Sequence, residues 1–283
     1  MRTLETKRIT PSIGAEVLGV DIDRLLHDRD FPEALAEALE ANGVLLFRGL
    51  YLDDAMQVAF SRRLGDLAIE SYGRFPEIME VSFDPKNPHA KYLAGTATWH
   101  MDGTVGKDFP PKATILTARI VPERGGETEF ASTYAAYEAL GDEEKARFAS
   151  YTVVHTFETA QRRHHPSPTP EQLADWSSRP AHKRPLVWEH LSGRRSLVLG
   201  GTMSHIAGMD PDESRALLQD LVERTTRPDR IFRHTWSVGD MVIWDNPGSM
   251  HHVCEFDRTA PRVLHRTELL GNERIVAASS SYV

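Results

Sequence analysis

The chain has 283 residues, 40% of them hydrophobic, which is enough for a substantial core in one large domain or two small ones. Its formal net charge of −8 argues against nucleic acid as the main partner. Its apolar runs are far shorter than the ~20 residues of a membrane span, and its first residues lack the apolar core of a signal peptide. The single cysteine, Cys254, cannot form an internal disulfide, and we therefore expect a reducing, cytoplasmic location without a membrane partner.

The first 65 or so residues predict a mixed α/β start. Residues 9–22 hold strand-like stretches that proline and glycine interrupt. A helix is expected over residues 32–41, because the Asn-Gly pair that follows is a good helix end. Residues 44–47 predict a buried strand, and residues 53–64 predict a second helix with Asp53 or Asp54 as its N-cap.

Short β-rich runs dominate the chain from residue 77 onward, and turn residues lie between most of them. Many short strands with glycine and proline between them are typical of a β-sandwich or barrel. The expected strands are residues 78–83, 114–121, 152–157, 196–199, 231–236, 241–244 and 262–270.

Two helices are predicted between these strands, over residues 132–140 and 211–225. Asp210 is the expected N-cap of the second helix, Pro211 takes its first position, and Glu213 would complete a capping box. The apolar stripe of this helix consists of Leu217, Leu218, Leu221 and Val222.

Residues 161–184 contain four prolines, three histidines and few large apolar side chains. We interpret this segment as a long loop or lid between two strands, with a short helix near residues 171–176. The alternative is a disordered surface insertion.

His100-Met101-Asp102 is the only His-x-Asp sequence in the chain. If residues 98–101 form a strand that leads into Asp102, His100 and Asp102 point to the same face, while Met101 packs behind them. Gly103 then lets the chain turn away. Two histidines and one carboxylate are the ligand set of non-haem iron(II) oxygenases, although zinc accepts the same set.

The third ligand is expected after the strand at 241–246 and the turn at 247–248, which makes His251 and His252 the candidates. Adjacent strand residues point to opposite faces, so only one of the two can reach the metal. The other is expected to face solvent or to hold a backbone group. Cys254, three residues after His251, is interpreted as a small buried residue, with metal ligation as the alternative.

Arg262 and Arg266 lie four residues apart in an apolar strand and share a face with Leu264. Buried arginines need anionic partners, and a planar guanidinium grips a carboxylate well. The pair therefore predicts a site for an organic acid. An edge strand with a solvated face is the alternative.

The sequence resembles the taurine dioxygenase / 2,4-dichlorophenoxyacetate dioxygenase family of Fe(II)- and 2-oxoglutarate-dependent oxygenases from about residue 9 to residue 273. The matching motifs are the segment 13–21, Trp-His-Met-Asp at 99–102, Gly-Gly-Glu-Thr at 125–128, the segment 134–140, Trp-Asp-Asn at 244–246 with His251, and Arg-Val-Leu-His-Arg at 262–266. The resemblance implies a mainly β fold with flanking helices, a double-stranded β-helix (jelly-roll, cupin-like) barrel. We expect one such domain over residues 1–283, with a lid or insertion at about 158–185.

The same resemblance implies which residues form the site. It places Fe(II) on His100, Asp102 and His251, and selects His251 over His252. It also implies that Thr128 and Arg262 hold the distal carboxylate of 2-oxoglutarate. Arg266 matches a position that contacts either the substrate anion or 2-oxoglutarate, and both roles stay open.

The implied activity is hydroxylation of a C–H bond of a small, anionic organic acid, or cleavage by way of the hydroxylated carbon, with O2 consumed and succinate and CO2 released. The presence of the Asp102 carboxylate favours hydroxylation over halogenation. The alternative function is a non-oxidative metal-binding cupin-like protein or a zinc hydrolase. Family members often form homodimers or tetramers, so a homo-oligomer is compatible with the resemblance, but the sequence itself does not decide the oligomeric state.

Two candidate substrate-binding residues depart from the taurine-type pattern. Glu70 stands where such members carry a histidine that grips a sulfonate, and a carboxylate there would repel that anion. Glu70 could instead meet an amine or hydroxyl, or lie on the surface. Thr96 stands near a position where these members direct an asparagine toward the substrate. Taurine itself is therefore disfavoured as the substrate.

Overall fold

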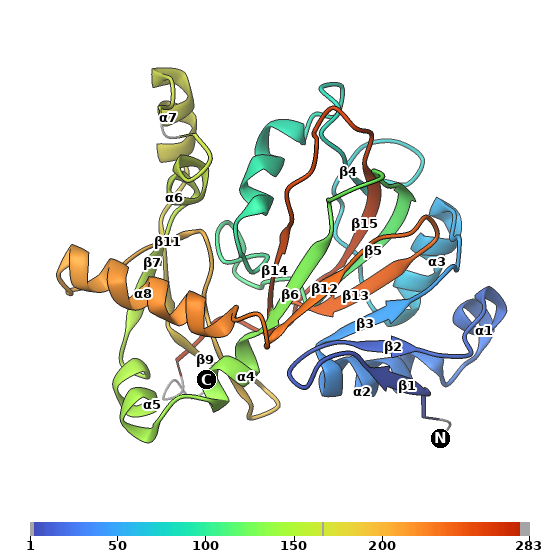
Figure 1. The fold of residues 1–283 in the computed structure, drawn as a ribbon, viewed down its shortest axis with the longest axis horizontal. Coiled ribbons are helices and arrows are strands. Elements are labelled where there is room, and N and C mark those ends of the chain that lie inside the picture. The colour runs from blue at the N-terminus through green and yellow to red at the C-terminus, as the bar shows by residue number, and fades with distance from the viewer. Residues whose placement is uncertain (1–2, 166, 278–283) are drawn as a thin grey trace.

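The computed structural model describes residues 3–165 and 167–277. Its largest sheet has seven strands in the order β1-β2-β3-β13-β5-β15-β4, and every neighbouring pair is antiparallel except β2 and β3 (Figure 1). The strands are β1 (Thr6–Arg8), β2 (Ala15–Val17), β3 (Val44–Phe47), β4 (Met79–Val81), β5 (Ala113–Ile120), β13 (Met241–Asp245) and β15 (Val263–Leu269).

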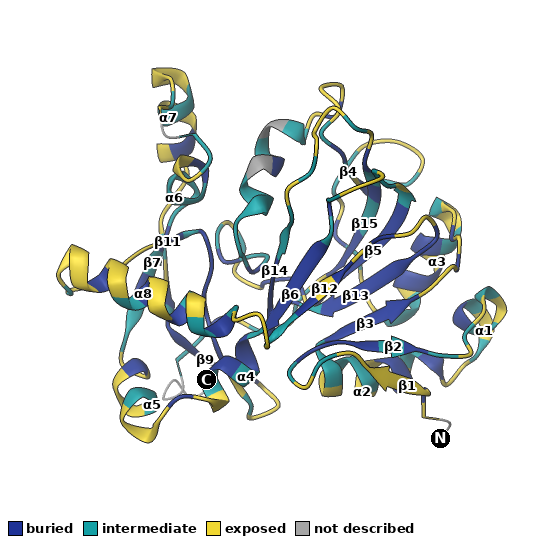
Figure 2. Ribbon diagram, in the orientation of Figure 1, coloured by how far each residue is buried: buried dark blue, intermediate teal, exposed yellow. Residues whose placement is uncertain are grey.

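A smaller antiparallel sheet, β12-β6-β14, faces the large one. Its strands are β6 (Thr128–Ser132), β12 (Ile231–His234) and β14 (Ser249–Val253). Phe130 and Phe232 from this sheet share one buried cluster with Val242, Trp244 and Leu264 from the large sheet, so a core lies between the two layers (Figure 2). This arrangement confirms the mainly β prediction and the jelly-roll layering, while the strand pairings of the described residues do not close a barrel.

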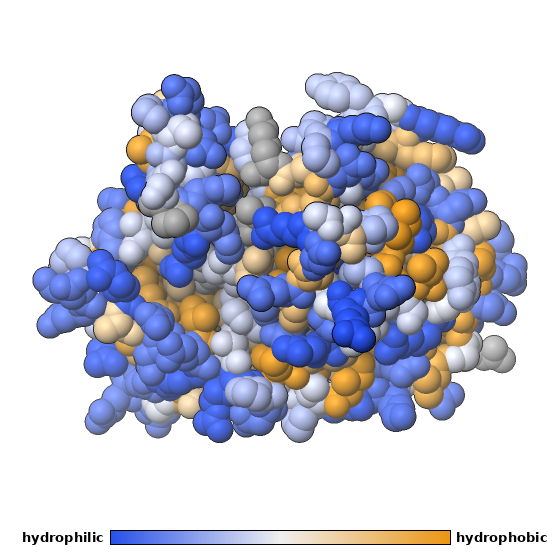
Figure 3. Space-filling model, turned by 45° about the horizontal axis from the view of Figure 1, so that its top comes forward, coloured by the Kyte–Doolittle hydropathy of each residue, from blue (hydrophilic) through white to orange (hydrophobic). Residues whose placement is uncertain are grey.

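The outer surface is mostly hydrophilic, with scattered hydrophobic patches on the face that Figure 3 presents. Isolated exposed apolar side chains are ordinary in folded proteins. Among the residues that the structure describes, the helices are all too short or too polar to cross a membrane.

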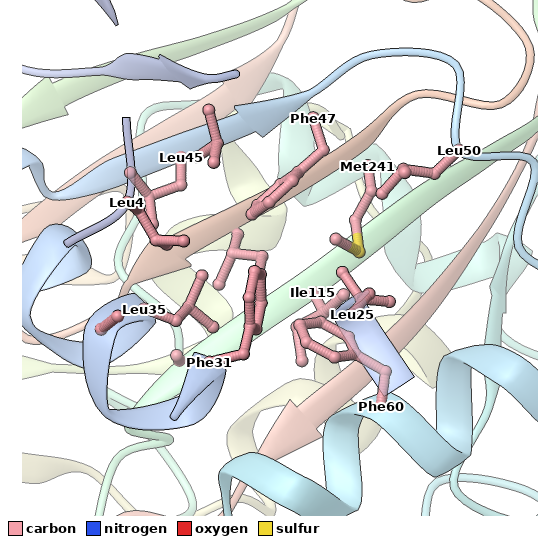
Figure 4. Packing of buried hydrophobic residues seen from close by; sticks show 14 of the residues in the cluster. Leu4, Leu25, Phe31, Leu35, Leu45, Phe47, Leu50, Phe60, Ile115 and Met241 are labelled. Atoms are coloured by element: carbon pink, nitrogen blue, oxygen red, sulfur yellow. The ribbon is translucent and has the colours of Figure 1, made fainter. Parts of the chain in front are cut away.

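Three helices cover the outer face of the large sheet: α1 (Ile22–His27), α2 (Phe31–Asn42) and α3 (Asp54–Leu64). Figure 4 shows Phe31 and Phe60 in the same buried cluster as Leu45 and Ile115 from strands of the sheet. The two helices predicted here are confirmed to within a residue or so at each end. Asp53 caps α3 as expected, because its carboxylate accepts the backbone N–H of Met56.

A second group of strands and helices lies beside the sandwich, to the left in Figure 1. It contains the sheet β11-β7-β8, the hairpin β9-β10 and a core of its own. Its elements are α4 (Thr133–Glu138), α5 (Asp142–Phe148), β7 (Thr152–His155), β8 (His182–Pro185), β9 (Val187–Glu189), β10 (Arg195–Leu197), β11 (Met203–Ile206) and α8 (Pro211–Thr225).

Helix α8 has the bounds that its sequence predicts, and its apolar stripe packs into this second core. The Asp210 carboxylate accepts the backbone N–H groups of Asp212 and Glu213. A returning hydrogen bond from the Glu213 side chain is not among those of the described residues, so only one half of the predicted capping box forms.

Between the paired strands β7 and β8, the chain forms the short helices α6 (Phe157–Arg162) and α7 (Pro170–Ser177), which project at the upper left of Figure 1. As predicted, residues 161–184 connect two strands and carry a short helix near 171–176, which is α7, whereas the end of α6 and the start of β8 within this segment were not expected. Thr169 caps α7 through the backbone N–H of Gln172, and Pro170 starts the helix. Whether this hairpin acts as a lid stays a prediction.

Candidate active site

Three candidate metal ligands, His100, Asp102 and His251, meet between the two sheets. One ligand atom from each side chain lies within 4.8 Å of the other two. A metal ion about 2.1 Å from each atom requires separations of at most about 4.2 Å, and His100 Nε2 lies 3.9 Å from Asp102 Oδ1, so the arrangement of the three side chains suits a metal ion.

His100 reaches this position without the strand that we expected around it. The 3-10 helix η1 (Ala90–Ala97) ends just before Thr98, and only His100 pairs with β14. Reciprocal backbone hydrogen bonds of 3.0 and 2.9 Å join His100 to His251, and their rings lie 4.2 Å apart between centroids. This single bridge, rather than a rigid strand, brings together two ligands that are 151 residues apart (251 − 100).

The turn after Asp102 forms as predicted. Gly103 has a φ of +79°, and a Cβ at this residue would lie 2.6 Å from Pro111 Cδ. Glycine is therefore needed for both its backbone angle and its size. Met101 is buried behind the two ligands, also as predicted.

His100 and His251 are both in a state that allows a ring nitrogen to donate its lone pair to a metal ion. His100 Nδ1 lies 2.8 Å from the carbonyl oxygen of Thr98, an acceptor that fixes the proton on Nδ1 and leaves Nε2 free. Burial lowers the pKa of His100, and it lowers the pKa of His251 to about 3. Both imidazoles are therefore neutral near pH 7, as metal ligation requires.

Asp102 is held as a carboxylate by its surroundings. Burial raises its pKa, but the nearby His251 and Arg266 lower it further, so that its pKa falls below the usual value. The Thr114 hydroxyl lies 3.4 Å from the Asp102 carboxylate and accepts a 2.9 Å hydrogen bond from the Asn246 amide. Asn246 in turn accepts the indole N–H of Trp244 at 2.7 Å.

Sequence reasoning assigned no role to Thr114 or Asn246. The signals available were that Asn246 belongs to the Trp-Asp-Asn motif and that Thr114 is a polar residue in an otherwise mostly apolar strand, β5, where it is fully buried. Its partner Asn246 lies 132 residues further along the chain. The pairing of β5 with β13 brings the two side chains together.

One cavity joins the three candidate ligands to four other predicted residues, Thr96, Thr128, Arg262 and Arg266. Its remaining walls are mostly apolar, so a molecule bound there is shielded from water. These apolar residues are Met79, Val81, Phe83, Leu93, Leu116, Trp244 and Val253. We call this space the central cavity. Glu70 is not among its lining residues.

Arg262 stands at one end of the central cavity with its charge unmatched. Its Nε donates to the carbonyl oxygen of Gly126 at 3.1 Å, and it takes part in none of the ion pairs formed by the described residues. Burial lowers its pKa to about 10, so it remains a cation at neutral pH. Gly126 permits the close approach, because a Cβ there would lie 3.1 Å from the Arg262 side chain.

Thr128 lies in the same cavity, and its hydroxyl oxygen accepts the Trp236 indole N–H at 2.9 Å. The hydroxyl proton is therefore left to be donated elsewhere. Together with the Arg262 guanidinium it can bind an anion.

Arg266 differs from Arg262, because two carboxylates contact its guanidinium. Its Nη2 lies 3.4 Å from Glu70 and 3.5 Å from Glu268, and Lys107 pairs with Glu268. Burial alone would lower the pKa of Arg266, but Asp102, Glu268 and Glu70 raise it. Strand β15 lies between β4 and β5, so the edge-strand alternative is wrong. Glu70 is only 19% exposed, so it is not a free surface residue either.

His252 points to the opposite face of β14, where its Nε2 lies 2.7 Å from Glu129. We expected solvent or a backbone group, and its Nδ1 does lie 3.1 Å from the Val253 carbonyl oxygen, but the carboxylate partner was not predicted. Glu129, His252 and Cys254 form a second close group of potential ligands. Arg233 already pairs with Glu129, and burial raises the pKa of the half-buried Cys254 thiol to about 11, so this group suits a metal less well.

Comparisons with known proteins identify the family. Residues 5–267 match the family described as taurine catabolism dioxygenase TauD, TfdA family. The chain is 33% identical over 270 residues to an (S)-phenoxypropionate/alpha-ketoglutarate-dioxygenase from Sphingobium herbicidovorans, with 92% of this chain and 93% of the relative covered. It is 32% identical over 263 residues to an alpha-ketoglutarate-dependent 2,4-dichlorophenoxyacetate dioxygenase from a Burkholderia species, with 87% and 88% covered.

Solved structures give the same result. The crystal structure of AAD-2 in complex with Mn(II) and N-oxalylglycine superposes with a TM-score of 0.81 at 29% identity, over 97% of this chain and all of that chain. Fold, site and relatives thus define a 2-oxoglutarate-dependent dioxygenase. The chain belongs to the TauD/TfdA family.

Proposed function

We propose that this dioxygenase oxidises a C–H bond of a small organic acid, with Fe(II) held by His100, Asp102 and His251. The balanced reaction is R–H + 2-oxoglutarate + O2 → R–OH + succinate + CO2. The observation that supports this proposal best is the convergence of the three side chains on one wall of a cavity whose far end holds the unmatched cation Arg262. Bound Fe(II) supplies the oxygen chemistry, which couples decarboxylation of 2-oxoglutarate to insertion of an oxygen atom.

The protein's own residues orient the reactants. In this proposal Arg262 and the Thr128 hydroxyl bind the distal carboxylate of 2-oxoglutarate, and the apolar walls keep water away from the reacting carbon. Asp102 keeps a carboxylate at the metal, which favours hydroxylation, or cleavage by way of the hydroxylated carbon. Thr96 and the apolar walls contact the substrate, and Arg266 binds an anionic group of the substrate or of 2-oxoglutarate.

The substrate that we propose is an anion with an apolar body. The two relatives are named for phenoxypropionate and 2,4-dichlorophenoxyacetate, which combine a carboxylate with an aromatic ring. The apolar walls of the central cavity suit such a body. The proposal has four further parts. We propose that the protein is cytoplasmic, that it forms a homodimer or tetramer, that it is a single domain, and that α6 and α7 form a lid.

A panel of aryloxy acids, sulfonates, sulfate esters and amino acids tests this function, with succinate release and oxygen uptake as readouts. We expect at least one acid to stimulate 2-oxoglutarate-dependent oxygen uptake, and we expect Asp102→Ala to remove this uptake. Anaerobically purified protein should carry iron. A zinc-bound protein with no 2-oxoglutarate-dependent oxygen uptake would instead support a hydrolase or a binding module.

A further inference from the structure

Four charged side chains form a ring at the Arg266 end of the central cavity. Arg266 contacts Glu70 and Glu268, and Lys107 pairs with Glu268 and lies 4.0 Å from Glu70. We call these residues the charged ring. It holds two cations and two carboxylates, so its charges are matched before any substrate binds.

Glu70 occupies the outer side of this ring. It lines a surface groove together with Ser71, Tyr72 and Phe75, whereas Arg266 lines the central cavity. The contact between Glu70 and Arg266 therefore joins a residue that lines the groove to a residue that lines the cavity.

The contacts of Glu70 are loose enough to open. They measure 3.4 Å to Arg266 and 4.0 Å to Lys107. Well-formed charge-assisted hydrogen bonds between nitrogen and oxygen are about 2.7–2.9 Å long. A ligand with suitable groups can therefore enter between Glu70 and Arg266 without disrupting a tight pair.

The sign of these charges determines which ligand gains from entry. A simple carboxylate or sulfonate on Arg266 comes close to the carboxylates of Glu70 and Glu268, and like charges at such distances repel. A ligand that also carries an ammonium group matches both sides, because its anion pairs with Arg266 and its cation pairs with Glu70. Every charge then keeps a partner.

We propose that Glu70 is a specificity-determining residue that selects a substrate with an ammonium group beside its carboxylate, an amino acid with an apolar side chain. This inference rests on the proposed oxygenase function and narrows its substrate class. In this arrangement the apolar side chain of the substrate extends toward the three candidate metal ligands and lies along apolar wall residues such as Met79 and Leu116.

The test uses matched pairs of compounds with the same carbon skeleton, hexanoate against norleucine and 4-phenylbutanoate against 2-amino-4-phenylbutanoate. kcat/KM is measured by succinate release for the wild type, Glu70→Gln and Glu70→Ala. We expect the wild-type enzyme to prefer the amino acid about tenfold or more, and Glu70→Gln to remove that preference by lowering kcat/KM for the amino acid and raising it for the plain acid. Glu80→Gln is the matched control, because Glu80 lines the same groove without contacting Arg266.

Two readouts separate the possible failures. If the wild-type enzyme does not prefer the amino acid of either pair, or if Glu70→Gln changes both members equally, Glu70 does not select an ammonium group and the inference is wrong. The proposed function would still hold in that case, provided that 2-oxoglutarate binds the Mn(II)-loaded protein and another acid drives succinate release. Loss of 2-oxoglutarate binding itself would overturn the proposed function instead.

Discussion

The two ends of the central cavity carry the same residue type in opposite electrostatic settings. Arg262 is buried without a carboxylate partner among the described residues, whereas Arg266, four positions further along, contacts two. A buried cation without a partner is costly and suits a ligand that always brings a dianion, such as 2-oxoglutarate. A cation that is already paired with carboxylates can instead discriminate between ligands, because each ligand must replace an existing contact in order to bind. In our proposal, strand β15 thus provides both a general anion site at Arg262 and a selective site at Arg266.

The largest loss of activity is expected when one of the three candidate metal ligands is replaced. Asp102→Ala removes a candidate metal ligand and should abolish succinate formation, because neither arginine can act without the metal that 2-oxoglutarate chelates. His252→Ala is the matched control, since His252 follows His251 on β14 but contacts Glu129 on the opposite face. Equal loss of activity in both variants would contradict the assignment.

The next largest effect is expected from replacement of Arg262. Arg262→Ala removes a charge-assisted pair worth about 2–5 kcal/mol, which corresponds to an increase of roughly 30-fold to several thousandfold in the 2-oxoglutarate requirement. Steady-state kinetics with 2-oxoglutarate as the varied substrate measures this effect. An unchanged KM for 2-oxoglutarate would show that Arg262 does not bind the carboxylate of 2-oxoglutarate. Arg233→Ala serves as the control, because Arg233 pairs with Glu129 outside the cavity.

A smaller effect is expected from Thr114, which links Asp102 to Asn246. Thr114→Val should weaken metal binding about 10- to 100-fold by freeing the Asp102 carboxylate, as observed for residues that orient metal ligands. Thr117→Val is the control, since Thr117 lies in the same strand and donates to Gln57. Metal titration of the apoprotein distinguishes the variants, and wild-type affinity in Thr114→Val would refute this role.

The smallest effect concerns the fold outside the cavity, at the fully buried His155 in β7. Burial lowers its pKa from 6.5 to about 3. Between these values the unfolded chain binds a proton that the folded chain does not, so the free energy of unfolding decreases as the pH falls below about 6.5, by roughly 1.4 kcal/mol per pH unit. His155→Gln does not titrate and should be about 2 kcal/mol less sensitive to a change from pH 7 to pH 5.

Urea unfolding at several pH values measures this difference. His205→Gln, at an exposed histidine of the neighbouring strand β11, should retain the wild-type pH dependence. A His155→Gln profile as steep as that of the wild type would show that another group causes the acid sensitivity.

The sequence predicted most of the elements that depend on local signals. Asp53 and Asp210 mark helix starts through side-chain caps, and both helices begin where expected. The strand predicted around His100 did not form, because η1 occupies the preceding residues and the pairing comes from β14, far along the chain. Local propensity does not report such distant partners.

The same limit applies to the site. The His-x-Asp motif indicated His100 and Asp102, and the family resemblance selected His251 over His252; these three residues do lie together. The contact between Glu70 and Arg266 spans 196 residues, and no sequence pattern indicated that Glu268 and Lys107 would join it. Charge pairing across a sheet depends on register, and the register between β15 and its neighbours is fixed only by the folded structure.

The most direct test is a crystal structure of this protein with Mn(II) and N-oxalylglycine, the pair present in the AAD-2 structure. Our account predicts the metal about 2.1 Å from one atom each of His100, Asp102 and His251, with the far carboxylate of the diacid on Arg262 and Thr128. A metal bound instead by Glu129, His252 and Cys254, or a diacid whose far carboxylate lies only on Arg266, would contradict it.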